Sequence, residues 1–345
     1  MNLSTKYLGI DLKNPVIAGA SKLTSELDSI KRLEDAGAAA VVTKSLFEEQ
    51  IQLERLNLDD QARDADYRHP EMINVFVDEE IEAGPDAHLS WVKSVKDAVS
   101  IPVIGSLNAV HHDTWIEYAQ KMAQTGVDAL ELNMYASPRD METNGSAIEK
   151  EQLAILKEIK EKVSIPVSVK LSLFYSNPLN MIASADKTGV DGFVLFNRLF
   201  QPSINVDKEA HTFPFNLSTP NDNAVPLRFA GLLYGNVSGS ICASTGIFHG
   251  KDVAKMLLAG ASCVQVVSTL YKNQIGHVRT MLSELESWME VKGYGSVSDF
   301  AGKLSKENSD DPWVYTRAQY ASLLLRPNPF APQQPGGPAA SDIGR

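Results

Sequence analysis

The chain has 345 residues, of which 43% are hydrophobic, and its formal net charge is −11 at pH 7. This length suffices for one large α/β barrel or for two ordinary domains. Because the net charge is negative and no basic run concentrates positive charge, we expect neither a nucleic-acid partner nor an acidic membrane surface. No signal-like apolar segment and no run of about 20 apolar residues is present, so we expect a cytoplasmic protein that does not bind a membrane.

Short apolar runs alternate with amphipathic segments along most of the chain. The runs that we predict to be strands are Pro15–Ala20, Ala39–Ser45, Ile101–Asn108, Ala129–Met134, Val167–Ser172, Gly192–Asn197, Ile241–Ile247 and the apolar part of Ala259–Thr269. The segments that we predict to be helices are Glu26–Ala36, Thr114–Gln124, Ala147–Val163 and Lys251–Leu258. Strands that alternate with helices predict a parallel sheet, and eight strands predict a closed (β/α)8 barrel, the TIM barrel.

A short phrase with glycine recurs before several of these strands. Thr125-Gly126-Val127-Asp128 and Thr188-Gly189-Val190-Asp191 are the most similar pair. A glycine that ends a helix and leads into a strand is typical of the connections in an α/β protein. We therefore interpret the phrase as repetition of the βα unit.

Two long segments and the C-terminal end do not fit a bare barrel. Phe47–Gly84 and Leu199–Val225 follow the second and sixth strands, where we expect them to be inserted loops that act as lids, or else disordered. We expect the barrel to span residues 1–304 and a short helical extension to span 305–326, with a helix over Trp313–Leu325. The remaining 327–345 lack core-forming residues, and we expect them to be disordered.

The chain contains only two cysteines, Cys242 and Cys263, and both lie in apolar strand-like runs. Neither has histidine or cysteine neighbours at the spacing of metal ligands. We therefore expect two buried core thiols, no disulfide and no metal site.

Polar residues gather at the carboxyl ends of the predicted strands, and in a barrel these ends meet at one mouth. They are Lys44, Ser45, Asn108, Asn133, Lys170, Asn197, Ser268 and Thr269. A lysine in a strand core is costly unless it is paired. Lys44 and Lys170 therefore either reach solvent or a carboxylate such as Glu131, or bind an anionic or electron-rich ligand. The loops after the seventh and eighth strands predict a phosphate pocket built from backbone N–H groups.

The order and spacing of these motifs resemble the dihydroorotate dehydrogenases of class 1, over roughly residues 3–304. The matching segments are Asn14-Pro15-Val16, Val42-Thr43-Lys44-Ser45, Ile73-Asn74, Glu131-Leu132-Asn133, Val169-Lys170-Leu171, Asn197 and Ala259–Val266. The resemblance implies non-covalently bound FMN across the barrel mouth, with Lys170 near the part of the flavin that becomes anionic on reduction. The residues that the resemblance assigns to FMN are Ala20, Lys44, Ser45, Asn133, Lys170, Asn197, Thr219, Ser244, Thr245, Gly246, Val267 and Ser268. Those that it assigns to the substrate are Lys44, Asn74, Asn133 and Asn197.

The chain departs from the family pattern in several places. Its phosphate loops contain less glycine than is usual, and Thr219 replaces a glycine, so we expect weakened but retained FMN binding. The segment after Asn133 is one residue longer before its Ser-Pro pair. Ser137 is the nearest candidate for the catalytic base beside Lys44, with Tyr135 or no base as the alternatives. Arginines at 139 and 198 stand where a substrate-binding asparagine and a small hydroxyl residue are typical, and they would either clamp a carboxylate or change the substrate.

The resemblance implies oxidation of dihydroorotate to orotate, a reaction of pyrimidine biosynthesis, with hydride transfer to the flavin. The alternatives are an FMN oxidoreductase with another substrate, a flavin electron-carrier subunit without the base, and a barrel isomerase or aldolase for a sugar phosphate. The electron acceptor is left open among fumarate, a partner redox protein with an iron–sulfur centre, and a quinone. We expect a homodimer.

Overall fold

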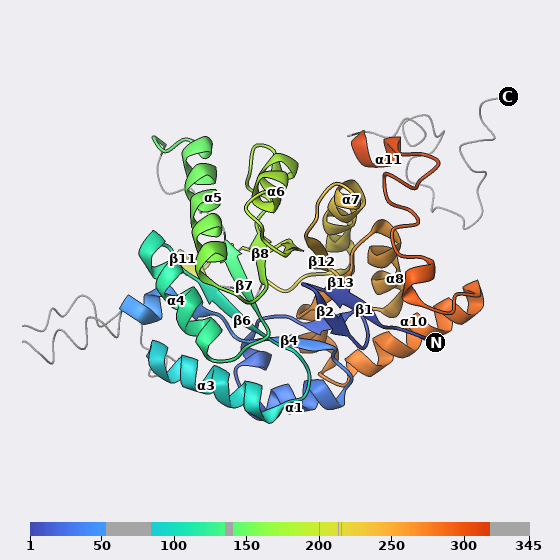
Figure 1. The fold of residues 1–345 in the computed structure, drawn as a ribbon, viewed down its shortest axis with the longest axis horizontal. Coiled ribbons are helices and arrows are strands. Elements are labelled where there is room, and N and C mark those ends of the chain that lie inside the picture. The colour runs from blue at the N-terminus through green and yellow to red at the C-terminus, as the bar shows by residue number, and fades with distance from the viewer. Residues whose placement is uncertain (53–83, 135–140, 200, 213, 215, 318–345) are drawn as a thin grey trace, which may run out of the picture.

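The computed structural model describes residues 1–317, except for 53–83, 135–140, 200, 213 and 215 (Figure 1). Eight parallel strands form a closed barrel, because each pairs with the next in chain order and the last pairs with the first. The barrel strands are β3 (Val16–Ala18), β4 (Ala40–Val42), β6 (Val103–Asn108), β7 (Ala129–Met134), β8 (Val167–Leu171), β9 (Gly192–Leu195), β12 (Ser240–Ser244) and β13 (Cys263–Val266). The predicted (β/α)8 barrel is therefore confirmed.

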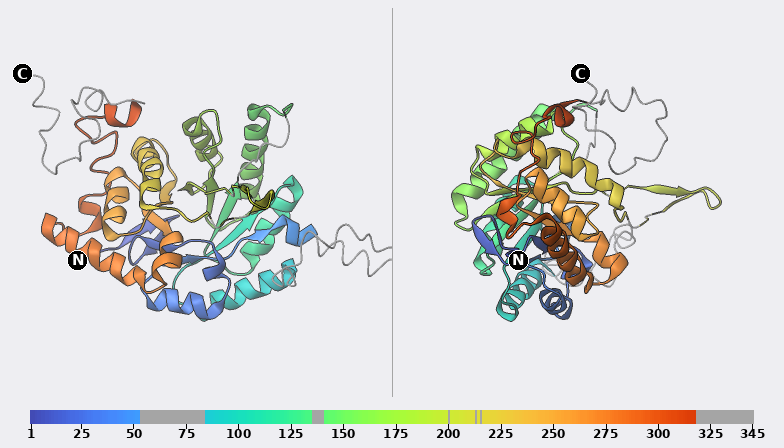
Figure 2. Two further views of the ribbon diagram at one scale, coloured as in Figure 1. Left: turned by 180° about the vertical axis from the view of Figure 1, so that it is seen from behind. Right: turned by 90° about the vertical axis from the view of Figure 1, so that its right-hand side faces the viewer.

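Helices surround the strands on the outside of the barrel (Figures 1 and 2). They are α1 (Leu27–Asp35), α3 (Pro85–Ala98), α4 (His112–Gln124), α5 (Gly145–Lys162), α6 (Pro178–Asp186), α7 (Ala224–Leu233), α8 (Gly250–Ala259), α9 (Ser268–Asn273) and α10 (His277–Lys292). Helices α1, α4, α5 and α8 match the predicted segments to within two residues at each end. Within the described residues, no helix is both long and apolar enough to cross a membrane.

The recurring glycine phrase has one structural role at both of its main occurrences. Gly126 and Gly189 end α4 and α6 with φ of 90° and 88°, a conformation that favours glycine. The aspartate two residues later then binds two neighbours. Asp128 accepts hydrogen bonds from the Val103 N–H at 2.7 Å and from Lys96 Nζ on α3. Asp191 does the same with the Val167 N–H at 2.8 Å and Lys160 Nζ at 2.6 Å, so each aspartate joins two strands and one helix at the amino-terminal face of the barrel.

An N-terminal hairpin closes that face of the barrel. It consists of β1 (Thr5–Tyr7) and β2 (Ile10–Leu12), and its Tyr7 and Leu8 side chains are buried in one cluster with the interior of the barrel. Cys242 and Cys263 belong to this cluster and lie opposite each other on adjacent strands, as buried free thiols.

The two insertions contain elements that the sequence patterns did not predict. Strand β5 (Leu46–Phe47) extends the segment after β4, and 53–83 lie outside the described residues. The second insertion forms the hairpin β10 (Ser203–Asn205) and β11 (Ala210–Thr212), which projects from the barrel in the right-hand view of Figure 2. Short turns of helix, η1 (Lys22–Thr24), η3 (Pro220–Asn223), η4 (Val297–Asp299) and α11 (Trp313–Thr316), complete the fold. The helix predicted over Trp313–Leu325 ends at Thr316, because Arg317 is extended, so that prediction was wrong in its length. Residues 318–345 lie outside the described residues, and the lid role of the insertions stays a prediction.

Candidate functional site

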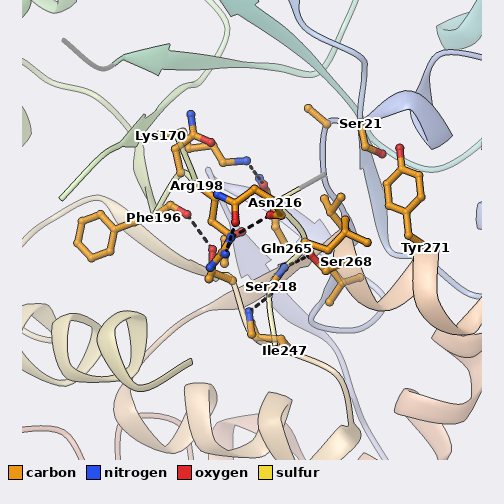
Figure 3. A pocket seen from close by; sticks show the side chains of 18 of the residues that line it. Ser21, Lys170, Phe196, Arg198, Asn216, Ser218, Ile247, Gln265, Ser268 and Tyr271 are labelled. Carbon is orange, nitrogen blue, oxygen red and sulfur yellow. Dashed lines mark hydrogen bonds between the residues drawn. The ribbon is translucent and has the colours of Figure 1, made fainter. Parts of the chain in front are cut away.

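A pocket of about 330 Å³ opens at the carboxyl ends of β3, β8, β9, β12 and β13 (Figure 3). Loops gather at this end of a parallel barrel, and it is the end where barrel enzymes carry their active sites. The volume falls in the range of roughly 300–1,000 Å³ that small-molecule sites occupy. The lining residues are Ala20, Ser21, Lys22, Lys170, Phe196, Asn197, Arg198, Asn216, Leu217, Ser218, Ser244, Thr245, Gly246, Ile247, Gln265, Val266, Val267, Ser268 and Tyr271.

One wall of the pocket is a tight backbone turn after β12. Thr245 and Gly246 have φ of 83° and 75°, and Gly246 needs its lack of a side chain, because a Cβ there would lie 2.4 Å from the Asn223 backbone N. The Thr245 hydroxyl donates to the Phe196 carbonyl at 3.1 Å, which joins the turn to the end of β9. The turn therefore brings main chain, not bulky side chains, to the edge of the pocket.

Ser218 connects this turn to the loop after β13. Its hydroxyl accepts a hydrogen bond from the Gly246 N–H at 3.2 Å, and its own N–H donates to the Ser268 hydroxyl at 2.9 Å. Lys272 of α9 donates to the Ser218 carbonyl at 2.9 Å and brings positive charge near both loops. Thr219 next to it does not line the pocket: its N–H and hydroxyl both donate to Asp222, and it begins η3.

The floor of the pocket is polar and buried. Lys170 of β8, 7% exposed, donates to Gln265 of β13 at 3.2 Å and lies 3.5 Å from the carboxylate of Glu131, which is 0% exposed. Gln265 Nε2 donates to the other carboxylate oxygen of Glu131. The sequence suggested either a carboxylate partner or a ligand site for Lys170. The structure shows that Lys170 contacts Glu131 and also lines the pocket.

Asn133 and Ser45 form a second polar group beside the pocket. Asn133 Nδ2 donates to the hydroxyls of Ser45 at 2.9 Å and Ser106 at 3.1 Å, and those two hydroxyls are 2.7 Å apart. Lys44 is half-buried, and its charge contributes with burial to lowering the pKa of His88 on α3 to about 4. His88 is therefore a neutral imidazole at neutral pH.

Arg198 lines the pocket but is held by its own loop. Its guanidinium donates to the Asn216 side chain at 2.6 Å and to the Asn216 carbonyl at 3.1 Å (Figure 3). It also lies 3.2 Å from the Asp222 carboxylate. Hydrogen bonds from the Thr219 N–H and hydroxyl, and then the Arg198 charge, lower the pKa of Asp222. These bonds occupy much of the donor capacity of Arg198.

The structure brings most of the predicted cofactor residues to one pocket. Those that line it are Ala20, Lys170, Asn197, Ser244, Thr245, Gly246, Val267 and Ser268. Lys44, Ser45, Asn133 and Thr219 are not among the lining residues. Asn74 and Ser137, with Tyr135 and Arg139, lie outside the described residues, so their roles stay predictions.

Several lining residues were not predicted. Gln265 could have been found, because it is a polar residue at an inward position of an apolar strand, but Ser21, Asn216 and Tyr271 carry no such signal. Among the residues that the structure describes, no group of three or more histidine, cysteine or acidic side chains is arranged to hold a metal ion.

Comparison with known proteins gives a consistent result. The sequence model of one family, described as dihydroorotate dehydrogenase, matches residues 2–289. The catalytic subunit of dihydroorotate dehydrogenase B (NAD⁺) from Thermoplasma volcanium is 29% identical over 313 residues, which cover 87% of this chain and 98% of the relative. The subunit of the same name from Methanocaldococcus jannaschii is 26% identical over 84% of this chain and 94% of the relative. The chloroplastic dihydropyrimidine dehydrogenase (NADP⁺) of Arabidopsis thaliana is 22% identical over 87% of this chain and 76% of that protein.

Proposed function

Because the chain belongs to the dihydroorotate dehydrogenase family and is an oxidoreductase that acts on CH–CH groups, we propose that it uses FMN to oxidise dihydroorotate to orotate. The observation that carries this proposal is the pocket itself. It combines a buried lysine at its floor with two backbone loops, joined by Ser218, at its wall.

The residues present fit FMN, which has an anionic phosphate at one end and an electron-accepting ring at the other. The Thr245–Gly246 turn and the start of α9 at Ser268 would hold the phosphate, since main-chain N–H groups can approach an anion where no side chain intervenes. Lys170 would lie at the ring end, where an ammonium favours negative charge.

In the oxidation, C5 of dihydroorotate loses a proton and C6 loses a hydride, so that a C=C bond forms between them. FMN, when bound, supplies the hydride acceptor. We propose Ser137 as the base that takes the proton; a serine can do so only if a neighbouring group or water carries the proton onward. Lys44, Asn74, Asn133 and Asn197 would hold the pyrimidine ring by hydrogen bonds. The NAD⁺-linked subunits among the relatives favour a partner redox protein over fumarate as the electron acceptor.

A second candidate substrate is a dihydropyrimidine without a carboxylate. Two observations favour it. Arg198 already donates to Asn216 and contacts Asp222, which leaves less of its guanidinium for a substrate carboxylate. One relative is named for dihydropyrimidine oxidation.

The absorption spectrum of the purified protein is the first test, because a protein without flavin bands would refute the FMN proposal. The protein is then mixed anaerobically with dihydroorotate or with dihydrouracil. Bleaching by dihydroorotate alone supports the main proposal, bleaching by dihydrouracil alone supports the second candidate, and bleaching by neither contradicts both and fits an oxidoreductase for another substrate or an electron carrier. Ser137→Ala is expected to slow the bleaching by a factor of about 10²–10⁴ without removing the flavin. Light scattering of the same preparation tests our proposal of a homodimer.

A further inference from the structure

A fully buried carboxylate lies beneath the floor of the pocket. Glu131 is in the middle of β7, two residues before Asn133, and it is 0% exposed. A carboxylate that is removed from water requires donors or positive charge around it. Lys170 Nζ lies 3.5 Å from one of its oxygens, and Gln265 Nε2 donates to the other.

These three side chains form a closed triangle across the barrel interior. The third side is the hydrogen bond of 3.2 Å from Lys170 Nζ to Gln265 Oε1, which Figure 3 shows at the pocket. Lys170 and Gln265 line the pocket, whereas Glu131 does not. The ammonium therefore faces the pocket on one side and a buried negative charge on the other.

The groups below the triangle add no charge to it. Burial raises the pKa of the Tyr7 hydroxyl and of the Cys263 thiol well above their ordinary values, so both are neutral at neutral pH. Within the triangle and the groups below it, the charged side chains are therefore the Lys170 ammonium and the Glu131 carboxylate.

We propose that Glu131 is a positioning residue with two effects: it fixes the Lys170 ammonium at the floor, and its own negative charge offsets part of that positive charge, so that it tunes the reduction potential of the bound cofactor. The inference rests on the proposed FMN site. The ammonium lies nearer the ligand than the carboxylate does, so the floor favours negative charge, but less than a lone ammonium would. Removing the charge of Glu131 should therefore make reduction of the cofactor easier.

The test is a spectroelectrochemical titration of the flavin in Glu131→Gln, a change that keeps the shape of the side chain. We expect the potential to rise by an amount that corresponds to roughly tenfold tighter binding of reduced relative to oxidised FMN, as for one charge removed at ~10 Å. Glu161→Gln on α5, where the carboxylate is 63% exposed, is the matched control and should leave the potential unchanged. An unchanged or lower potential in Glu131→Gln would overturn the proposal.

A second comparison removes the same charge in a background without the lysine. Lys170→Met should have the lowest potential of the set, and the double variant Lys170→Met/Glu131→Gln should lie above it. Equal potentials in these two proteins would also overturn the proposal, even where Glu131→Gln alone does not fold.

Unfolding of the flavin-free protein separates failure of this inference from failure of the proposed function. Lys170→Met leaves a buried carboxylate unpaired, so it should be less stable than the double variant. If the unaltered protein binds no FMN, the proposed function fails, and so does the proposed effect of Glu131 on the reduction potential. The unfolding comparison still decides whether Glu131 and Lys170 are a charge pair. A double variant that is no more stable than Lys170→Met would refute the pairing.

Discussion

Substitution of Gly246 by alanine should damage the pocket wall more than its small size suggests. The residue has φ of 75°, and a Cβ there would lie 2.4 Å from the Asn223 N and 2.8 Å from the Asp222 carbonyl carbon. The left-handed conformation costs an alanine about 1–2 kcal/mol, and relief of a close contact with backbone costs about 1–3 kcal/mol more. We therefore expect the free energy of unfolding to fall by about 2–5 kcal/mol.

Gly126→Ala separates the two contributions. Gly126 has φ of 90°, but nothing lies within 4 Å of its would-be Cβ, so this variant should lose only the conformational part, about 1–2 kcal/mol. Urea unfolding of both flavin-free variants measures the difference.

The same clash should weaken cofactor binding. Movement of the turn would carry its main-chain N–H groups away from the proposed phosphate position, and loss of one hydrogen bond to FMN costs about 1 kcal/mol, or roughly fivefold in the FMN dissociation constant. Fluorescence titration with FMN should show this increase for Gly246→Ala and none for Gly126→Ala. Equal stabilities and equal affinities in the two variants would refute the assignment of this turn as a constrained wall.

Two further predictions concern stability. Asp191→Asn and Asp128→Asn should each lower the free energy of unfolding by about 1–3 kcal/mol, because each removes a charged acceptor from a backbone N–H and a lysine. Similar urea midpoints for the two variants would support equivalent roles of the two aspartates. Midpoints equal to that of the unaltered protein would contradict the prediction. In the folded protein, burial and then the charge of Lys44 lower the pKa of His88 from 6.5 to about 4. Between these pH values, His88 is therefore protonated in the unfolded chain and neutral in the folded protein. Stability should accordingly fall by up to about 3 kcal/mol as the pH drops from 6.5 to 4, and this loss should be absent above pH 6.5. Unfolding midpoints of His88→Leu across this range should show a flatter profile, and a slope equal to that of the unaltered protein would contradict the assignment.

The barrel could be predicted from the sequence because its strands are buried on both faces. Runs such as Val16–Ala18 and Ala40–Val42 are apolar on both faces, and the strands at Ala129–Met134 and Val167–Leu171 begin and end within one residue of the predicted segments. The projecting hairpin of β10 and β11 could not be predicted in this way. Its Ile204 is 64% exposed, so no burial pattern distinguishes the strand from a polar loop.

The site was predictable only in part, because several of its contacts join segments that lie far apart in the sequence. Lys170 and the Ser244–Gly246 turn lie on or directly after barrel strands, where position in the sequence determines position at the mouth. Ser218 comes from the long insertion after β9, and only the folded loop shows that it, not Thr219, bonds to both the loop after β12 and the loop after β13. Asn133 bonds to Ser45 and Ser106 through geometry across strands that no local pattern specifies.

The hairpin that closes the amino-terminal face also bears on when the protein can fold during synthesis. Although the hairpin is made before the barrel strands, the Leu8 N–H donates to the Ser240 hydroxyl and the Thr5 hydroxyl donates to the Ser262 carbonyl. Asn2 pairs still further along the chain, with Ser296. The hairpin segment must therefore wait for nearly all of the barrel to be synthesised, and such long-range closure is slow because the chain entropy is lost before the contacts form. Until then the apolar residues that pack against the hairpin stay uncovered at that end of the barrel, where transiently exposed apolar surface favours aggregation.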